Sequence, residues 1–175
     1  MTKSMLILGA YLHALGMATY VGGSFVMEFV LGPAQKLIPP AQAQVVSQKS
    51  ADRFLLVVWG ALGSVLAGGL LRLFAMRNAG ILVSRNLYAS GYGRSLLVMV
   101  SGWCLLVING LILTFVLRPK LSGKMSAAVS AQQAQSRQQT MMQAAKWAGR
   151  IVRTDLVIAV LIVFIGASIR GGGIL

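Results

Sequence analysis

Four apolar stretches, each long enough to cross a bilayer, constrain this chain more than any other feature. They cover residues 5–31, 54–71, 95–117 and 151–169. A spanning helix needs about 20 mostly apolar residues. A mean hydropathy of +0.76 with 11% charged residues excludes an ordinary soluble domain. We therefore predict an all-α fold, an integral membrane four-helix bundle formed by a single domain over residues 1–175.

Polar segments are predicted to divide these spans. Gly32-Pro33 and Arg118-Pro119 are expected to end the first and third helices, because proline lacks a backbone donor. A short helix is predicted to begin near Pro40 and to stop before Asp52-Arg53. Residues 126–150 are rich in Ala and Gln and predict a polar, water-facing helix. Nothing breaks that helix firmly before the fourth span, which leaves a continuous helix open.

Small residues repeat every four positions on two of the spans. The first span carries Ala10-Ala14-Ala18-Gly22 and the second carries Gly60-Ser64-Gly68. Small side chains let neighbouring helices approach closely in a membrane. We expect these two ridges to let neighbouring helices approach closely, either inside the bundle or in a partner subunit.

A polar stripe on the first span is the main candidate for function. At helical spacing its members share one face, and they are His13, Met17, Tyr20, Ser24 and Glu28. An ionisable side chain in hydrocarbon is costly, so each one marks a functional hypothesis. His13 is expected to face the bundle, because unsatisfied ring nitrogens are unfavourable in lipid.

Three interpretations of His13 remain open at this point. Its imidazole suits an axial ligand of haem b. Together with the thioether of Met17 it suits copper, with a third ligand from elsewhere. The third interpretation is a histidine that bonds a neighbouring helix and holds no cofactor. Glu28 lies too far along the helix to share a metal with His13.

No catalytic residue is assigned from the sequence. Three acidic residues and one histidine leave few acid–base groups, which favours a non-enzymatic protein. Asn109 in the third span needs a partner in lipid, and a hydrogen bond to the stripe on the first span would satisfy it. We interpret Tyr20, Ser24, Glu28 and Asn109 as structural polar residues.

A net charge of +13 does not indicate nucleic-acid binding. The Lys and Arg residues are scattered over connections and helix ends, and no nucleic-acid module is present in the pattern. Such residues hold the orientation of spans and attract anionic lipid headgroups. The expected partners are the lipid bilayer and other membrane subunits.

The motifs resemble the copper-resistance protein D family of small helical membrane proteins. His13-Ala-Leu-Gly-Met-Ala-Thr-Tyr-Val-Gly-Gly23, with Gly32-Pro33-Ala34, is similar to the first helix and loop of these domains. Ala51-Asp-Arg-Phe54 resembles the second helix, and Gly91-Tyr-Gly-Arg94 resembles the entry to the third. Tyr20 stands where the family commonly has Trp, and Arg94 stands where it commonly has Lys.

The resemblance implies a role in copper tolerance or uptake, and distant relatives include a haem-associated protoporphyrinogen oxidase. We expect a CopD-like, non-enzymatic protein for metal or haem handling, or a small accessory subunit of a larger membrane complex. A haem-dependent membrane oxidoreductase is the alternative. In either case the resemblance implies that His13 is the ligand. We expect a multi-pass protein of a bacterial inner (cytoplasmic) membrane. Arg94 is interpreted as a further structural polar residue.

The charge distribution predicts that both termini lie outside the cytosol. Lys and Arg are more frequent on the side that carries Lys36, Lys49, Arg53 and residues 118–153, and the positive-inside rule places that side in the cytosol. An impermeant thiol reagent applied to intact cells should label a Ser4→Cys variant and spare a Ser126→Cys variant. Labelling of the second variant alone would reverse the orientation.

Overall fold

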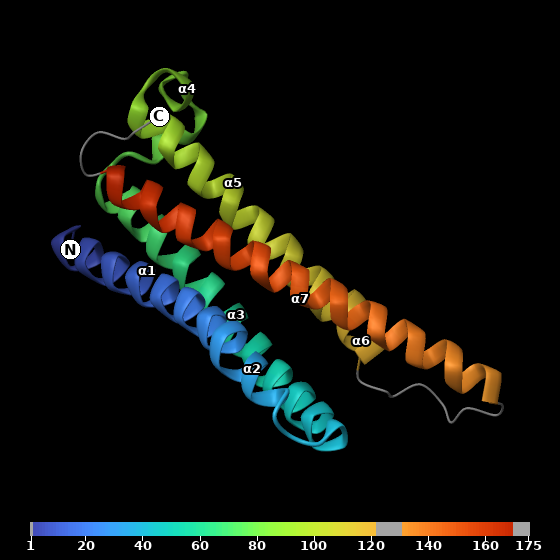
Figure 1. The fold of residues 1–175 in the computed structure, drawn as a ribbon. Helices are drawn as coiled ribbons and strands as arrows, with labels where there is room; N and C mark the ends of the chain where they lie inside the picture. The colour runs from blue at the N-terminus through green and yellow to red at the C-terminus, as the bar shows by residue number, and fades with distance from the viewer. Residues whose placement is uncertain (1, 122–130, 170–175) are drawn as a thin grey trace.

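The computed structural model describes residues 2–121 and 131–169, and its long elements are all helices (Figure 1). The predicted all-α four-helix bundle is confirmed. In chain order the elements are α1 (Thr2–Phe25), η1 (Val26–Leu31), α2 (Gly32–Gln35), α3 (Pro40–Ala75), η2 (Ala79–Val83), α4 (Asn86–Ala89), α5 (Gly91–Leu111), η3 (Ile112–Leu117), α6 (Arg118–Leu121) and α7 (Ala131–Ser168).

Four helical segments are long and apolar enough to cross a membrane. They are Lys3–Gln35, Gln42–Ala75, Gly91–Leu121 and Gln135–Ser168. α3 has 36 residues and α7 has 38. At 1.5 Å per residue, each of these two helices is more than about 50 Å long, whereas the hydrocarbon layer is about 30 Å thick. Both helices therefore extend beyond the bilayer, with their polar N-terminal parts at the same end of the bundle (Figure 1).

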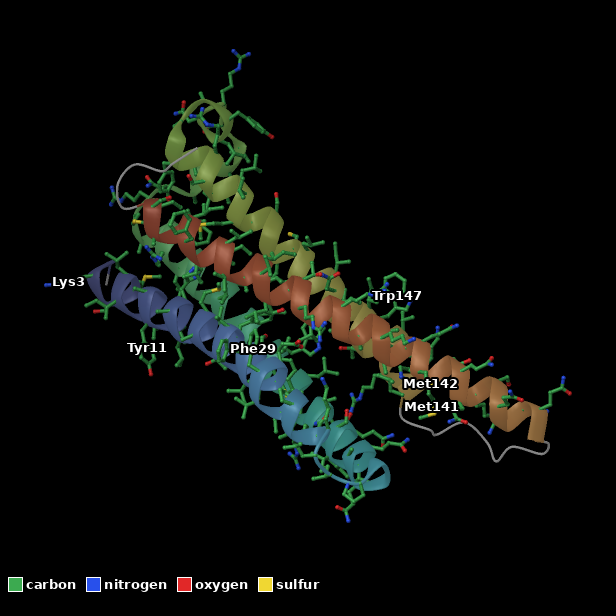
Figure 2. All side chains as sticks on the ribbon, viewed as in Figure 1. Lys3, Tyr11, Phe29, Met141, Met142 and Trp147 are labelled. Atoms are coloured by element: carbon green, nitrogen blue, oxygen red, sulfur yellow. The ribbon has the colours of Figure 1, made fainter. Side chains whose placement is uncertain are left out.

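The polar helix predicted before the fourth span is confirmed for residues 131–150, while residues 126–130 lie outside the described residues. It is the first half of α7 and continues into the span without a break. Figure 2 shows Met141, Met142 and Trp147 on this part, which extends beyond the neighbouring helices.

The predicted stop of the short helix before Asp52-Arg53 is wrong, because α3 runs unbroken from Pro40 to Ala75. That pair of charges directly precedes the apolar stretch 54–71, but neither residue breaks the helix.

The two prolines expected to end helices do not end them. Each lies two residues after a π-helical segment, Pro33 after η1 and Pro119 after η3. At these segments the backbone bonds reach five residues back, from Gly32 N–H to the Met27 carbonyl and from Arg118 N–H to the Leu113 carbonyl. The wider turn relieves the clash of a proline ring with the carbonyl four residues earlier. Both helices therefore continue for one more turn.

α1 and α3 form the closest helix pair of the fold, and glycines make their contact. A Cβ on Gly16 would lie 2.7 Å from the Ala61 carbonyl oxygen, and a Cβ on Gly68 would lie 2.6 Å from the Gly9 carbonyl oxygen. The Ser64 hydroxyl adds a 3.0 Å hydrogen bond to the Leu12 carbonyl. Two helix backbones can approach each other this closely only where no side chain lies between them.

The ridge predicted on the first span does not face the other helices of the bundle. Its members, Ala10-Ala14-Ala18-Gly22, are all exposed on the outside of the bundle. The contact with α3 is made instead by Gly9 and Gly16 on another face of α1. On α3 the ridge is confirmed in part, since Ser64 and Gly68 face α1 while a Cβ on Gly60 would meet nothing within 4 Å.

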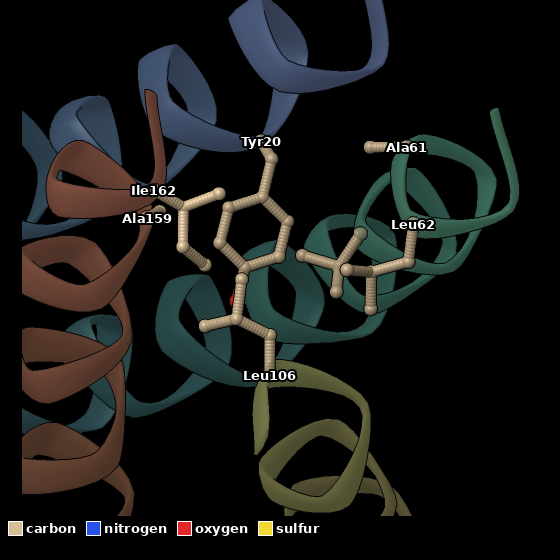
Figure 3. Packing of buried hydrophobic residues seen from close by; sticks show 7 residues of the cluster. Tyr20, Ala61, Leu62, Leu106, Ala159 and Ile162 are labelled. Atoms are coloured by element: carbon tan, nitrogen blue, oxygen red, sulfur yellow. The ribbon is translucent and has the colours of Figure 1, made fainter. Parts of the chain in front are cut away.

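The second helix pair, α5 and α7, packs on the first through a small apolar core. α7 contacts both α1 and α5, and α5 also reaches α3. Figure 3 shows the Tyr20 ring from α1 surrounded by apolar side chains of the other three helices. These are Ala61 and Leu62 of α3, Leu106 of α5, and Ala159 and Ile162 of α7. The Trp103 indole nitrogen donates to the Leu62 carbonyl at 3.2 Å and fixes α5 against α3.

The connection from α3 to α5 lies at the opposite end from the polar part of α7 (Figure 1). α3 ends in a Schellman motif, in which Asn78 N–H bonds the Leu73 carbonyl and Arg77 N–H bonds the Phe74 carbonyl. Arg77 takes the left-handed conformation there, with φ of 55°. Arg94 donates through Nη1 to the carbonyls of Tyr88 and Ala89, both at 3.2 Å. Arg94 thus holds the end of α4 against the start of α5.

Replacing Gly68 should loosen the bundle. In Gly68→Ala the new methyl group meets backbone atoms of α1, which cannot rotate away, so we expect destabilisation by about 1–3 kcal/mol. Gly60→Ala in the same helix is the matched control, because its methyl group has open space and Ala favours helix. Thermal unfolding in one detergent compares them. Equal melting temperatures would contradict the proposed close contact.

Candidate functional site

His13 lies against α3 near the middle of α1 and is half-buried. Its Nδ1 is 2.9 Å from the carbonyl oxygen of Val65. The glycine contacts at Gly9, Gly16 and Gly68 bring the α3 backbone within reach of this ring. The expectation that His13 faces the bundle is therefore confirmed.

The Val65 contact also sets the tautomer of His13. A carbonyl oxygen only accepts, so Nδ1 carries the proton, and in the neutral ring Nε2 then holds the lone pair. Gly69 lies beside the imidazole, where a Cβ would be 3.6 Å from Nδ1. A side chain at position 69 would cover a ring that glycine leaves accessible. Histidines that bind metals commonly donate their other nitrogen to a backbone carbonyl in this way.

Met17, one turn beyond His13, packs against the apolar core around Tyr20. It is partly buried there. In residues 2–121 and 131–169, no three His, Cys, Asp or Glu side chains come together as a metal site. The pairing of His13 with Met17 around copper stays a prediction.

Tyr20 and Ser24 lie deeper in the bundle, beside a carboxyl group that the stripe does not contain. Tyr20 is 4% exposed and its hydroxyl donates to Asp155 Oδ2 at 3.4 Å. Asn109 Nδ2 donates to Asp155 Oδ1 at 2.6 Å. Asp155 is 3% exposed and links α1, α5 and α7. The expected bond of Asn109 to the first-helix stripe is wrong, because Asp155 stands between Asn109 and Tyr20.

A small cavity of about 10 Å³ adjoins this group of polar side chains. Tyr20, Ser24 and Asp155 contribute its polar wall, and Val58 and Leu113 are among the apolar side chains that complete it. A space of this size corresponds to about one water molecule. The cavity can therefore hydrate the buried carboxyl group, and it has no room for an organic substrate.

Two ion pairs lie nearer to the end of the bundle. Glu28, in η1, accepts from Arg153 Nε of α7. Asp52 of α3 accepts from Arg118 Nε at 2.8 Å. The stripe is thus divided among three environments: His13 at α3, Tyr20 and Ser24 at Asp155, and Glu28 at Arg153.

Sequence reasoning missed the structural position of Asp155 and the bond between Trp59 and Thr114. The Trp59 indole nitrogen donates to Thr114 Oγ1 at 3.1 Å, across α3 and η3. A signal for Asp155 existed, since it is the one acidic residue of the fourth apolar stretch. Its partners could not be found in this way, because helix pairing decides which faces meet.

The fold and these polar contacts define a multi-span membrane protein. Comparisons of the chain with protein families, with curated proteins and with solved structures found no match.

Removing the Asp155 carboxyl group should destabilise the bundle. Asp155→Ala leaves the Asn109 amide and the Tyr20 hydroxyl without their shared acceptor, at a cost of about 1–3 kcal/mol. Asp52→Ala, which removes only a solvent-exposed ion pair, should change stability by less than about 1 kcal/mol. The check is denaturant unfolding in mixed micelles. A larger loss for Asp52→Ala would mean that the buried contacts are not what joins the helices.

Proposed function

We propose that this protein is a non-enzymatic membrane subunit that handles haem, or another metal centre, through His13. The observation that carries this proposal is the 2.9 Å contact between His13 Nδ1 and the Val65 carbonyl. It orients the ring and leaves the Nε2 lone pair for a metal ion. The CopD-like motifs around His13 support the same assignment.

The donor set fits haem better than copper. Haem iron needs one axial imidazole from a protein chain, whereas copper needs two or three close ligands. His13 is the single histidine of the chain, and the Met17 side chain packs toward the apolar core. Where the iron takes a second axial histidine, that histidine would come from another chain, because this sequence has one. That requirement connects haem binding with the role of an accessory subunit.

Water alone fits the cavity beside Asp155, whose volume is about 10 Å³, so we do not assign Asp155 a role as acid or base for an organic substrate. The bound group would supply redox or ligand-binding chemistry, while the chain's own residues would orient the imidazole and exclude water around it. We propose a bacterial cytoplasmic membrane as its location.

Visible absorption and metal analysis of purified protein test this proposal. Wild type, isolated in mild detergent as a larger complex or reconstituted with added haem, should show a Soret band. His13→Asn should lose at least about nine-tenths of it, since Asn can keep the bond to the Val65 carbonyl but has no Nε2. Met17→Leu should keep the Soret band. Copper that binds to wild type and is lost in both His13→Asn and Met17→Leu would favour the copper pair instead.

A second variant tests the site without changing the ligand. Gly69→Leu should cover the imidazole and weaken haem binding, while His13 stays in place. His13→Asn and Gly69→Leu should each unfold at the temperature of wild type without haem if the fold is intact. Wild type that carries neither haem nor copper, and takes up neither when supplied, would make His13 a structural residue.

A further inference from the structure

A groove between α3 and the end of the third span has a polar rim and an apolar floor. Its volume is about 490 Å³. The α3 side is formed by Lys49, Asp52, Arg53, Leu55, Leu56 and Trp59. The opposite side is formed by Thr114 of η3 and Arg118 of α6.

Three hydrogen-bonded contacts hold the walls of this groove together. The ion pair of Asp52 with Arg118 closes the rim at 2.8 Å. The bond from Trp59 to Thr114 closes the deeper part at 3.1 Å. Gln48 adds a third link, since its Nε2 donates to the Leu121 carbonyl at 3.0 Å. The groove is therefore built by the fold and does not depend on a chance placement of surface side chains.

The rim carries a positive charge that no carboxylate among residues 2–121 and 131–169 neutralises. The whole sequence contains three acidic side chains. Asp52 is paired with Arg118, Glu28 with Arg153, and Asp155 with Asn109. Lys49 and Arg53, one helical turn apart on the same face, are thus left without a carboxylate partner among the described residues. An anion from outside the chain would complete the rim.

The floor has the chemistry of an acyl-chain contact. Leu56 and Trp59 line the same groove as Arg53 and lie about 5 and 9 Å further along α3 at 1.5 Å per residue. Leu56 is 67% exposed. Basic groups above an apolar wall match a molecule with an anionic head and a hydrocarbon tail.

We propose that this groove is a specific site for an anionic phospholipid, with the phosphate at Lys49 and Arg53 and one acyl chain along Leu56 and Trp59. The headgroup and the acyl chain both contact α3, beside the Asp52–Arg118 pair that joins α3 to α6. The lipid therefore occupies the groove at the end of the bundle where the ion pairs lie.

Lipid binding to purified, full-length protein tests this site. Native mass spectrometry would compare phosphatidylglycerol, phosphatidylcholine and inorganic phosphate. Wild type should retain phosphatidylglycerol at least about tenfold more tightly than the other two, as expected for two basic groups near a headgroup. Equal retention of phosphatidylcholine, or phosphate binding as tight as that of the lipid, would overturn the proposal.

Two matched double variants distinguish lipid binding in the groove from a general effect of positive charge on the protein surface. Lys49→Gln/Arg53→Gln should lose the preference for phosphatidylglycerol by about tenfold, and it leaves the Asp52–Arg118 pair intact. Lys36→Gln/Lys146→Gln removes the same charge from exposed residues at the same end of the bundle and should lose less than about threefold. Equal losses in the two variants would contradict a specific site.

A fluorescence measurement on wild type does not depend on those variants. Phosphatidylglycerol brominated on its acyl chain should quench tryptophan emission more than brominated phosphatidylcholine, and Trp59→Phe should remove that difference. Quenching that is independent of the headgroup, or unchanged by Trp59→Phe, would place the lipid elsewhere.

Discussion

The close approach of the α1 and α3 backbones is the constraint on which the rest of the structure depends. Glycines at positions 9, 16 and 68 leave no room for a side chain between the two helices. Because lipid is as apolar as Leu, packing and short polar contacts hold helices together in a membrane. The same approach brings the Val65 carbonyl to His13 and the Leu12 carbonyl to Ser64. The candidate ligand is thus positioned by backbone atoms.

A small group of polar side chains joins the second helix pair to the first. Asp155 accepts from Asn109 and from Tyr20, and so connects three of the four long helices. A buried carboxyl group is tolerated only when its acceptors are used. Its neighbouring cavity has room for about one water. The outer ion pairs and the proposed lipid lie toward the same end of the bundle, where α3 and α7 leave the bilayer.

Two π-helical segments let the helices pass through two prolines. Their wider turn relieves the clash between a proline ring and the carbonyl four residues earlier, so the helix continues for one more turn. η1 and η3 lie at the same distance before Pro33 and Pro119. η1 carries Glu28 toward Arg153, and η3 carries Thr114 toward Trp59. The local distortion thus contributes to the polar contacts at this end.

The sequence by itself determined the four spans, the all-α class, the polar helix before the fourth span and the polar face of the first, while the structure decided that this polar helix continues into the span. Length and hydropathy suffice for these, because the bilayer imposes both. Only the tertiary structure decided that Gly9 and Gly16 face α3 while Ala10 and Ala14 face outward, and that Asn109 bonds Asp155. In a membrane the lipid-facing and protein-facing sides of a helix are both apolar, so periodicity does not separate them. The pairing of helix faces depends on contacts between residues far apart in the chain.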